Sequence, residues 1–168
     1  GTIGLELMRQ AKALGVDLDA VIVPCGGGGL SSGISVAVKD ASPNTAVWAV
    51  EPEHFDDTRR SLAAGARVSN EPGHSSICDA LLTAEPGVIT FEINRRNLTG
   101  GIAVSDQAAA QAMRDAMAYL KLVVEPGGCV ALAALSSGEI ELSGKCIAVV
   151  LSGGNVDFGT YAGIMAAA

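Results

Sequence analysis

Short apolar runs alternate along the chain with segments of helical periodicity. Apolar and β-branched residues fill four such runs, at positions 20–24, 46–50, 88–93 and 145–151. Runs of this length are typical of buried strands in a parallel sheet. Helices are predicted over residues 2–14, 30–39, 56–64, 76–82, 105–122, 128–135 and 159–168. Because parallel strands need crossover connections, this order predicts an α/β fold: a parallel twisted sheet with helices on both faces.

Composition and charge exclude several classes of protein. The 168 residues are 49% hydrophobic, which is enough for the core of one domain and too apolar for a disordered chain. No apolar run reaches the roughly 18 residues that span a bilayer. The net charge is −7, whereas a protein that binds a nucleic-acid backbone needs a basic face. We therefore expect a protein that contacts neither nucleic acid nor membrane.

The cysteines predict a reducing compartment. Cys25, Cys78, Cys129 and Cys146 are far apart in sequence and form no C-x-x-C pair or zinc motif. A chain of this length has enough core to fold without disulfides. We expect free thiols and a cytoplasmic location.

A run of four glycines follows the first predicted strand, in the segment CGGGGLSSG at positions 25–33. Consecutive glycines leave backbone N–H groups uncovered, and the helix that follows adds its own free N–H groups and a favourable dipole. The pattern matches neither a Walker A motif nor the G-x-G-x-x-G spacing. It predicts a loop that cradles a phosphate, with a tight turn as the alternative.

Other polar residues also follow predicted strands, where ligands bind to parallel sheets. Ser152, in the segment SGGN, stands after the last strand, although the same segment would serve as a simple turn. Glu51 and Asp57 follow the second strand and, with a backbone carbonyl between them, would suit Mg²⁺ or Ca²⁺. The alternative there is a solvated acidic turn that caps the next helix. We expect residues 94–97 to form a solvated loop, and His54 and His74 to be surface residues.

These segments together resemble a known family. CGGGGLSSG, AVEPEHFDD, ICDALL, VVEPGGCVALAAL and VLSGGNVDF, in this order, are similar to the fold-type II pyridoxal-phosphate enzymes, and most of all to the threonine/serine dehydratase and serine racemase group. The resemblance implies pyridoxal 5′-phosphate as cofactor. It places the cofactor beside Gly26, Gly27, Gly28, Gly29, Leu30, Ala80, Glu125 and Ser152, with the four glycines on the phosphate and Ser152 on the pyridine nitrogen. It also raises the expectation of a cation held by Glu51, Asp57 and the Phe55 carbonyl.

The resemblance implies an activity for a longer parent protein. That activity is an ammonia-lyase reaction on a β-hydroxy amino acid such as threonine or serine, giving a 2-oxo acid and ammonia. A serine racemase or a 3-hydroxyaspartate dehydratase is the alternative. Relatives are usually homo-oligomers, which we expect of the parent protein as well.

One departure from the family is serious. The Schiff-base lysine of the family stands in an S-F-K-type motif that this sequence lacks, and Lys39, Lys121 and Lys145 have no comparable context. We expect residues 1–168 to be part of the large, cofactor-binding domain, without the smaller domain and the lysine region. The chain by itself is then a catalytically inert fragment that carries no catalytic residue.

Overall fold

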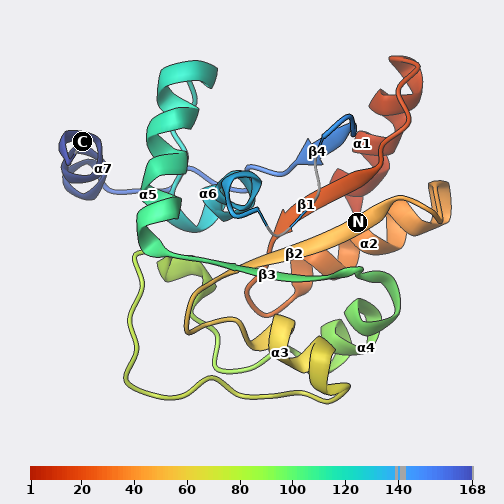
Figure 1. Ribbon diagram of the computed structural model, residues 1–168, viewed down its shortest axis with the longest axis horizontal. Coiled ribbons are helices and arrows are strands. Elements are labelled where there is room, and N and C mark those ends of the chain that lie inside the picture. Colours follow the sequence, from red (N-terminus) through yellow and green to blue (C-terminus); the bar gives the residue numbers. More distant parts are fainter. Residues whose placement is uncertain (139, 141–142, 168) are drawn as a thin grey trace.

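Four parallel strands form the centre of the computed structural model, which describes residues 1–138, 140 and 143–167. The strands are β1 (Ala20–Pro24), β2 (Ala46–Pro52), β3 (Gly100–Val104) and β4 (Ile147–Val149), in the spatial order β3-β2-β1-β4 (Figure 1). All three neighbouring pairs are parallel. The predicted α/β fold is therefore confirmed.

Helices cover both faces of this sheet. They are α1 (Thr2–Ala13), α2 (Gly29–Ala41), α3 (Asp57–Ala64), α4 (Val88–Asn97), α5 (Asp106–Asp115), α6 (Pro126–Ala133) and α7 (Phe158–Ala166). Three short turns complete the elements: η1 (Asp79–Leu81), the π-helical η2 (Ala116–Leu120) and η3 (Ala134–Ser136). Figure 1 shows α5 and α6 on the left of the sheet and α1 and α2 on the right.

Successive side chains of β1 point to alternate faces of the sheet, so the hydrophobic core consists of two clusters. Val21 and Val23 pack with Ile34 and Val38 of α2 on one face. Ile22 points to the other face and joins a larger cluster that includes residues of α5 and α6. Successive side chains of a strand point to opposite faces, so a strand with five buried residues needs a helical layer on each side.

The register brings the carboxyl ends of the central strands to one edge of the sheet. Pro24 of β1 lies opposite Val50 of β2, and Ile22 lies opposite Val149 of β4. The loops that follow these strands therefore leave the sheet side by side. This edge holds the residues singled out from the sequence.

The prediction of a strand over residues 88–93 was wrong, because these residues open α4 and the third strand is β3. The apolar residues of this segment suggested a buried strand. In the structure, Ile89 is 76% exposed, while Phe91 and Asn94, three residues apart, face the core. The true strand begins with Gly100, where a Cβ would lie 2.7 Å from the Trp48 ring. Packing against neighbours thus overrides the β-propensity of the apolar run.

Two further expectations about local structure were wrong. Residues 94–97, expected in a solvated loop, form the last turn of α4, and Asn94 is fully buried. Residues 76–82, expected to be helical, contain only the single turn η1. Asp106 explains the second difference, because its carboxylate accepts hydrogen bonds from the Ser76 hydroxyl and the Ile77 N–H and fixes this segment outside a helix.

The expectation of free thiols agrees with the structure. All four cysteines are free thiols, and only Cys146 is exposed. Throughout the described ranges, the helices are too short or too polar to cross a membrane.

Candidate functional site

The four-glycine loop (residues 26–29) connects β1 to α2 at the carboxyl edge of the sheet. Gly28 has φ +88°, a left-handed conformation that favours glycine. Within the described chain, no N–H group of the loop donates a hydrogen bond to another residue. Unpaired N–H groups at the start of a helix of 13 residues match an anionic group with several acceptor oxygens, such as a phosphate.

The loop is enclosed by two other segments. The backbone of Leu81 in η1 lies 3.4 Å from the position that a Gly26 Cβ would occupy. The Thr83 side chain approaches Gly27 in the same way, at 3.7 Å. The Thr83 hydroxyl is buried and has no hydrogen-bond partner among the described residues. An unpaired buried hydroxyl beside the loop is a further donor that an anion could use.

Ala80 lies close to the loop, and Glu125 lies at the start of α6. A Cβ on Gly127, at the start of α6, would stand 3.5 Å from the Ala80 Cβ and 3.2 Å from Leu81. Gly26 and Gly127 thus contact η1 from two sides. Glu125 is the residue before α6, and its carboxylate accepts a 2.8 Å hydrogen bond from the Asn155 N–H. The turn after β4 is thereby tied to the start of α6.

Ser152 belongs to this same group of segments. Its N–H lies 3.3 Å from the Gly128 carbonyl, and Val150 just before it still donates to Ile22 of β1. Ser152 is the third residue after β4, and Cys25 comes directly after the adjacent strand β1. Its side chain is exposed, and its hydroxyl donates to no other residue in the described part of the chain. Ser152 and the four-glycine loop therefore follow adjacent parallel strands at the same edge of the sheet.

Glu51 and Asp57 form a buried acidic pair below this edge. The two Glu51 oxygens accept hydrogen bonds from the N–H groups of Thr58 and Arg59, each at 2.8 Å, so this side chain caps α3. One oxygen of Asp57 accepts a 2.6 Å bond from Asn70, while Oδ2 is buried without a partner among the described residues. A buried carboxylate oxygen without a donor suits a cation.

Burial perturbs the acidity of this pair. It raises the pKa of Glu51 to about 8, with a smaller contribution from the Asp57 carboxylate, against the opposing hydrogen bonds. It raises the pKa of Asp57 to about 6, although the Asn70 hydrogen bond opposes this. Cys25 contacts the hydroxyl of Thr58, and its burial together with Glu51 raises the pKa of its thiol to about 12. A thiol with this pKa is protonated near neutral pH, which makes Cys25 a weak nucleophile.

Phe55 and the histidines complete the set of predicted residues. Phe55 lies between Glu51 and Asp57 in the turn that opens α3, and its N–H donates to the Pro52 carbonyl. In the described ranges, no group of three or more His, Cys, Asp or Glu side chains could hold a metal, so a cation would depend on the two carboxylates and this carbonyl. His54 and His74 are exposed, as expected, and stack with ring centroids 4.2 Å apart.

Sequence reasoning missed three residues that support the site. Thr90 and Asn94 of α4 contact the four-glycine loop and Ser31, and Asn70 holds Asp57. Thr90 and Asn94 are four residues apart, a spacing that places two side chains on the same face of a helix. This signal could not be used because the segment was predicted to be a strand. Asn70 stands in an irregular segment and had no local signal.

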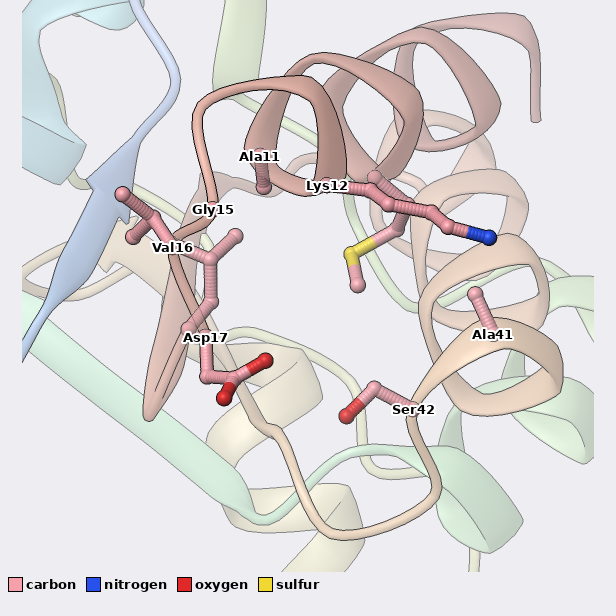
Figure 2. A pocket seen from close by; sticks show the side chains of 9 residues that line it. Ala11, Lys12, Gly15, Val16, Asp17, Ala41 and Ser42 are labelled. Atoms are coloured by element: carbon pink, nitrogen blue, oxygen red, sulfur yellow. The ribbon is translucent and has the colours of Figure 1, made fainter.

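Cavities alone do not mark the site. A cavity of about 560 Å³ lies at the other end of β1, where Asp17 and Ser42 border it from opposite sides (Figure 2). None of the predicted site residues lines it. A smaller cavity of about 340 Å³ is lined by Glu125, with Ser76, Asp79 and Asn155, and therefore adjoins the edge described above.

Comparisons with known proteins show the family to which this chain is related. A profile described as pyridoxal-phosphate dependent enzyme matches residues 1–153. A serine racemase of Dictyostelium discoideum is 39% identical over 98% of this chain and 50% of its own length. A phenylserine dehydratase of Ralstonia pickettii is 43% identical over 96% of this chain and 48% of its own length. The chain thus spans about half the length of these curated relatives.

A solved structure extends the comparison to the fold. The crystal structure of a T.th. threonine deaminase superposes with a TM-score of 0.87 and 43% identity, covering 92% of this chain and 52% of that one. Its sheet and helices match those described above over nearly the whole chain. From the family match, the identities and this superposition, the chain belongs to the pyridoxal-phosphate dependent enzymes and has the fold-type II architecture.

Proposed function

We propose that this chain is the cofactor-binding part of an ammonia-lyase that acts on a β-hydroxy amino acid such as threonine or serine. Elimination of water from the substrate, followed by hydrolysis of the resulting imine with one water molecule, would give a 2-oxo acid and ammonia. The observation that carries the proposal is the cluster of unpaired N–H groups in the four-glycine loop, next to Ser152 on the adjacent strand end. Phenylserine dehydratase and threonine deaminase, by their names, act on β-hydroxy amino acids. When bound, pyridoxal 5′-phosphate supplies the electron sink for such an elimination.

The four-glycine loop would hold the cofactor phosphate. Gly26, Gly27, Gly28 and Gly29 would donate their N–H groups to its oxygens, and Leu30, in the first turn of α2, adds to the positive end of that helix. The Thr83 hydroxyl is a further candidate donor because it is buried and unpaired in the described structure. The loop would thereby fix the position of the phosphate, and the bound cofactor would supply acid–base chemistry there for the leaving hydroxyl.

Ser152, Glu125 and Ala80 would contact the ring. The Ser152 hydroxyl would hydrogen-bond the pyridine nitrogen. A carboxylate in this place would keep the nitrogen protonated, whereas a hydroxyl would not. A ring that withdraws electrons less strongly suits a reaction in which the electrons leave with the substrate hydroxyl. Glu125 and Ala80 would border the ring at the edges formed by α6 and η1.

The acidic pair would bind a divalent cation. Asp57 Oδ2 is a buried acceptor with no donor in the described chain, and the Phe55 carbonyl lies between the two carboxylates in sequence. Oxygen ligands of this kind suit Mg²⁺ or Ca²⁺. The cation would hold the turn between β2 and α3 beside the cofactor edge.

A second activity, racemisation, has support from several comparisons. The relative from Dictyostelium discoideum is named a serine racemase. Racemisation and elimination share the removal of the Cα proton, and a group outside this chain would decide between them. We also propose that the lysine that bonds to the cofactor lies outside residues 1–168, so that this chain alone is inactive.

Two measurements test the proposal. The 168-residue chain should bind pyridoxal 5′-phosphate more tightly than pyridoxal, and Ser152→Ala should shift the absorbance of the bound ligand while leaving the preference for the phosphate intact. The protein assembled with its lysine-bearing segment should release 2-oxobutanoate from L-threonine. Formation of D-serine from L-serine without keto acid would instead support the racemase. No preference for the phosphorylated ligand would contradict the assignment of the four-glycine loop.

A further inference from the structure

Thr90 of helix α4 makes a direct hydrogen bond to the backbone of the four-glycine loop. The Thr90 hydroxyl lies 2.6 Å from the Gly27 carbonyl oxygen, and the Gly87 N–H donates to the same oxygen at 3.2 Å. The hydroxyl also lies 3.1 Å from the Gly87 carbonyl. The shorter distance makes Gly27 its principal acceptor, because hydrogen bonds between oxygens are strongest below about 2.8 Å.

The contact between α4 and the loop is close. A Cβ on Gly28 would stand 2.9 Å from the Thr90 hydroxyl and 2.9 Å from the Asn94 amide nitrogen. Asn94 donates to the Ser31 hydroxyl at 3.0 Å, which extends the contact into the first turn of α2. The loop therefore rests on α4, although Thr90 and Gly27 are 63 residues apart in sequence.

Peptide geometry gives this contact a consequence for anion binding. The C=O of Gly27 and the N–H of Gly28 belong to one planar trans peptide, so they point in opposite directions. Holding the carbonyl on α4 therefore directs the Gly28 N–H away from α4. The Gly28 carbonyl is also engaged, by the Ser32 N–H at 2.9 Å and the Ser31 hydroxyl at 3.2 Å.

Glycine itself cannot fix this orientation. A peptide between two glycines rotates with little steric cost, and a rotated peptide would present a carbonyl oxygen, not an N–H group, to an anion. Some group outside the loop must therefore bias the peptide. We infer that Thr90 is a positioning residue for phosphate recognition: its hydroxyl holds the Gly27 carbonyl and so keeps the Gly28 N–H available to the anion. This inference rests on the proposed function.

The test compares two ligands on three proteins. Pyridoxamine 5′-phosphate and pyridoxamine differ only in the phosphate, and neither has an aldehyde that could react with lysines. Their dissociation constants are measured by fluorescence titration for the wild-type chain, Thr90→Val and Thr90→Ser. Valine keeps the shape of threonine but has no donor, whereas serine keeps the donor and loses the methyl group.

The ratio of the two affinities is the readout, because a general packing defect would weaken both ligands equally. Thr90→Val should reduce the preference for the phosphorylated ligand by roughly fivefold, the order of effect expected from one neutral hydrogen bond, and leave pyridoxamine binding unchanged. Thr90→Ser should stay within about twofold of wild type, because it keeps that hydrogen bond. If Thr90→Val does not fold, Thr90→Cys, with its weaker thiol donor, should show a partial loss.

The outcomes distinguish a failure of the proposed function from a failure of the positioning role of Thr90. A wild-type chain that does not discriminate between the ligands overturns the proposed function and, with it, the role of Thr90. A wild-type chain that discriminates, together with a Thr90→Val ratio equal to wild type or an equal loss for both ligands, overturns the positioning role alone.

Discussion

Asn70 donates a 2.6 Å hydrogen bond to Oδ1 of Asp57, and this is the one side-chain hydrogen bond that the described structure offers to the Asp57 carboxylate. The Asn70 amide also donates to the Thr83 carbonyl at 2.8 Å, so it joins the acidic pair to the segment beside the four-glycine loop. Replacing Asn70 with Ala should lower the free energy of unfolding by about 1–3 kcal/mol, because a buried carboxylate then loses its donor. Urea denaturation at pH 7 measures the loss, with Asn97→Ala, whose amide has only a 3.4 Å contact, as the control.

The acidic pair predicts an unusual dependence of stability on pH. Folding raises the pKa of Asp57 from 3.8 to about 6 and that of Glu51 from 4.5 to about 8. The folded chain therefore holds more protons than the unfolded chain between about pH 4 and pH 8, and its free energy of unfolding should fall as the pH rises through this window. Urea denaturation at pH 5 and pH 8 checks the sign. The slope should flatten in Asp57→Asn, and an increase in stability from pH 5 to pH 8 would contradict the prediction.

A divalent cation should offset the loss of stability that ionisation of Glu51 and Asp57 causes at high pH. Millimolar Ca²⁺ or Mg²⁺ should raise the melting temperature of the wild-type chain at pH 8, because ligand binding to the folded state alone stabilises it. Sodium chloride at matched ionic strength is the control. The shift should vanish in Asp57→Asn, which keeps the shape but loses the charge. An equal shift in both proteins would show that the cation binds elsewhere.

Gly28 should tolerate no side chain. Gly28→Ala would force a Cβ into a residue with φ +88° and against Thr90 and Asn94 at 2.9 Å. The expected loss is about 1–3 kcal/mol of stability, together with a loss of preference for a phosphorylated ligand. Gly29→Ala is the matched control, since a Cβ there meets nothing within 4 Å. Similar stabilities for the two variants would mean that the loop does not have the conformation described.

The thiols should differ sharply in reactivity. Burial raises the pKa of Cys25, Cys78 and Cys129 to about 12, whereas Cys146 is exposed. Thiol reagents attack the thiolate, so a native chain at pH 8 should react rapidly at one cysteine. Titration with Ellman's reagent counts it, and Cys146→Ser should abolish the rapid phase. Reaction of a second thiol on the same timescale would place one of the buried cysteines at the surface.

The sequence predicted the parts of this molecule that depend on local pattern. The runs at residues 20–24 and 46–50, which lie in β1 and β2, are apolar on both faces, and such runs are informative because both faces of the sheet are covered. The four-glycine loop and Ser152 were found because they follow strands, and parallel strands place such residues at one edge.

Long-range packing produced the features that the sequence did not reveal. α4 has apolar residues typical of a strand, yet its position is decided by Phe91 and Asn94 facing the core. β3 begins with two glycines that allow Trp48 and Arg59 to approach, which no local pattern could indicate. Thr90 and Asn70 act on partners far away in the chain, and only the folded arrangement shows them.

The hydrogen bond between Thr90 and Gly27 also links ligand binding to the order in which the elements of the chain fold. A segment containing only β1, the loop and α2 would contain all four glycines of the loop. It would lack Thr90, the residue that orients the peptide between Gly27 and Gly28. Affinity for an anion should therefore emerge late, after α4 has docked. A phosphorylated ligand added during refolding would act as a template, and it should rescue variants weakened at the distant α4 as effectively as variants weakened in the loop itself.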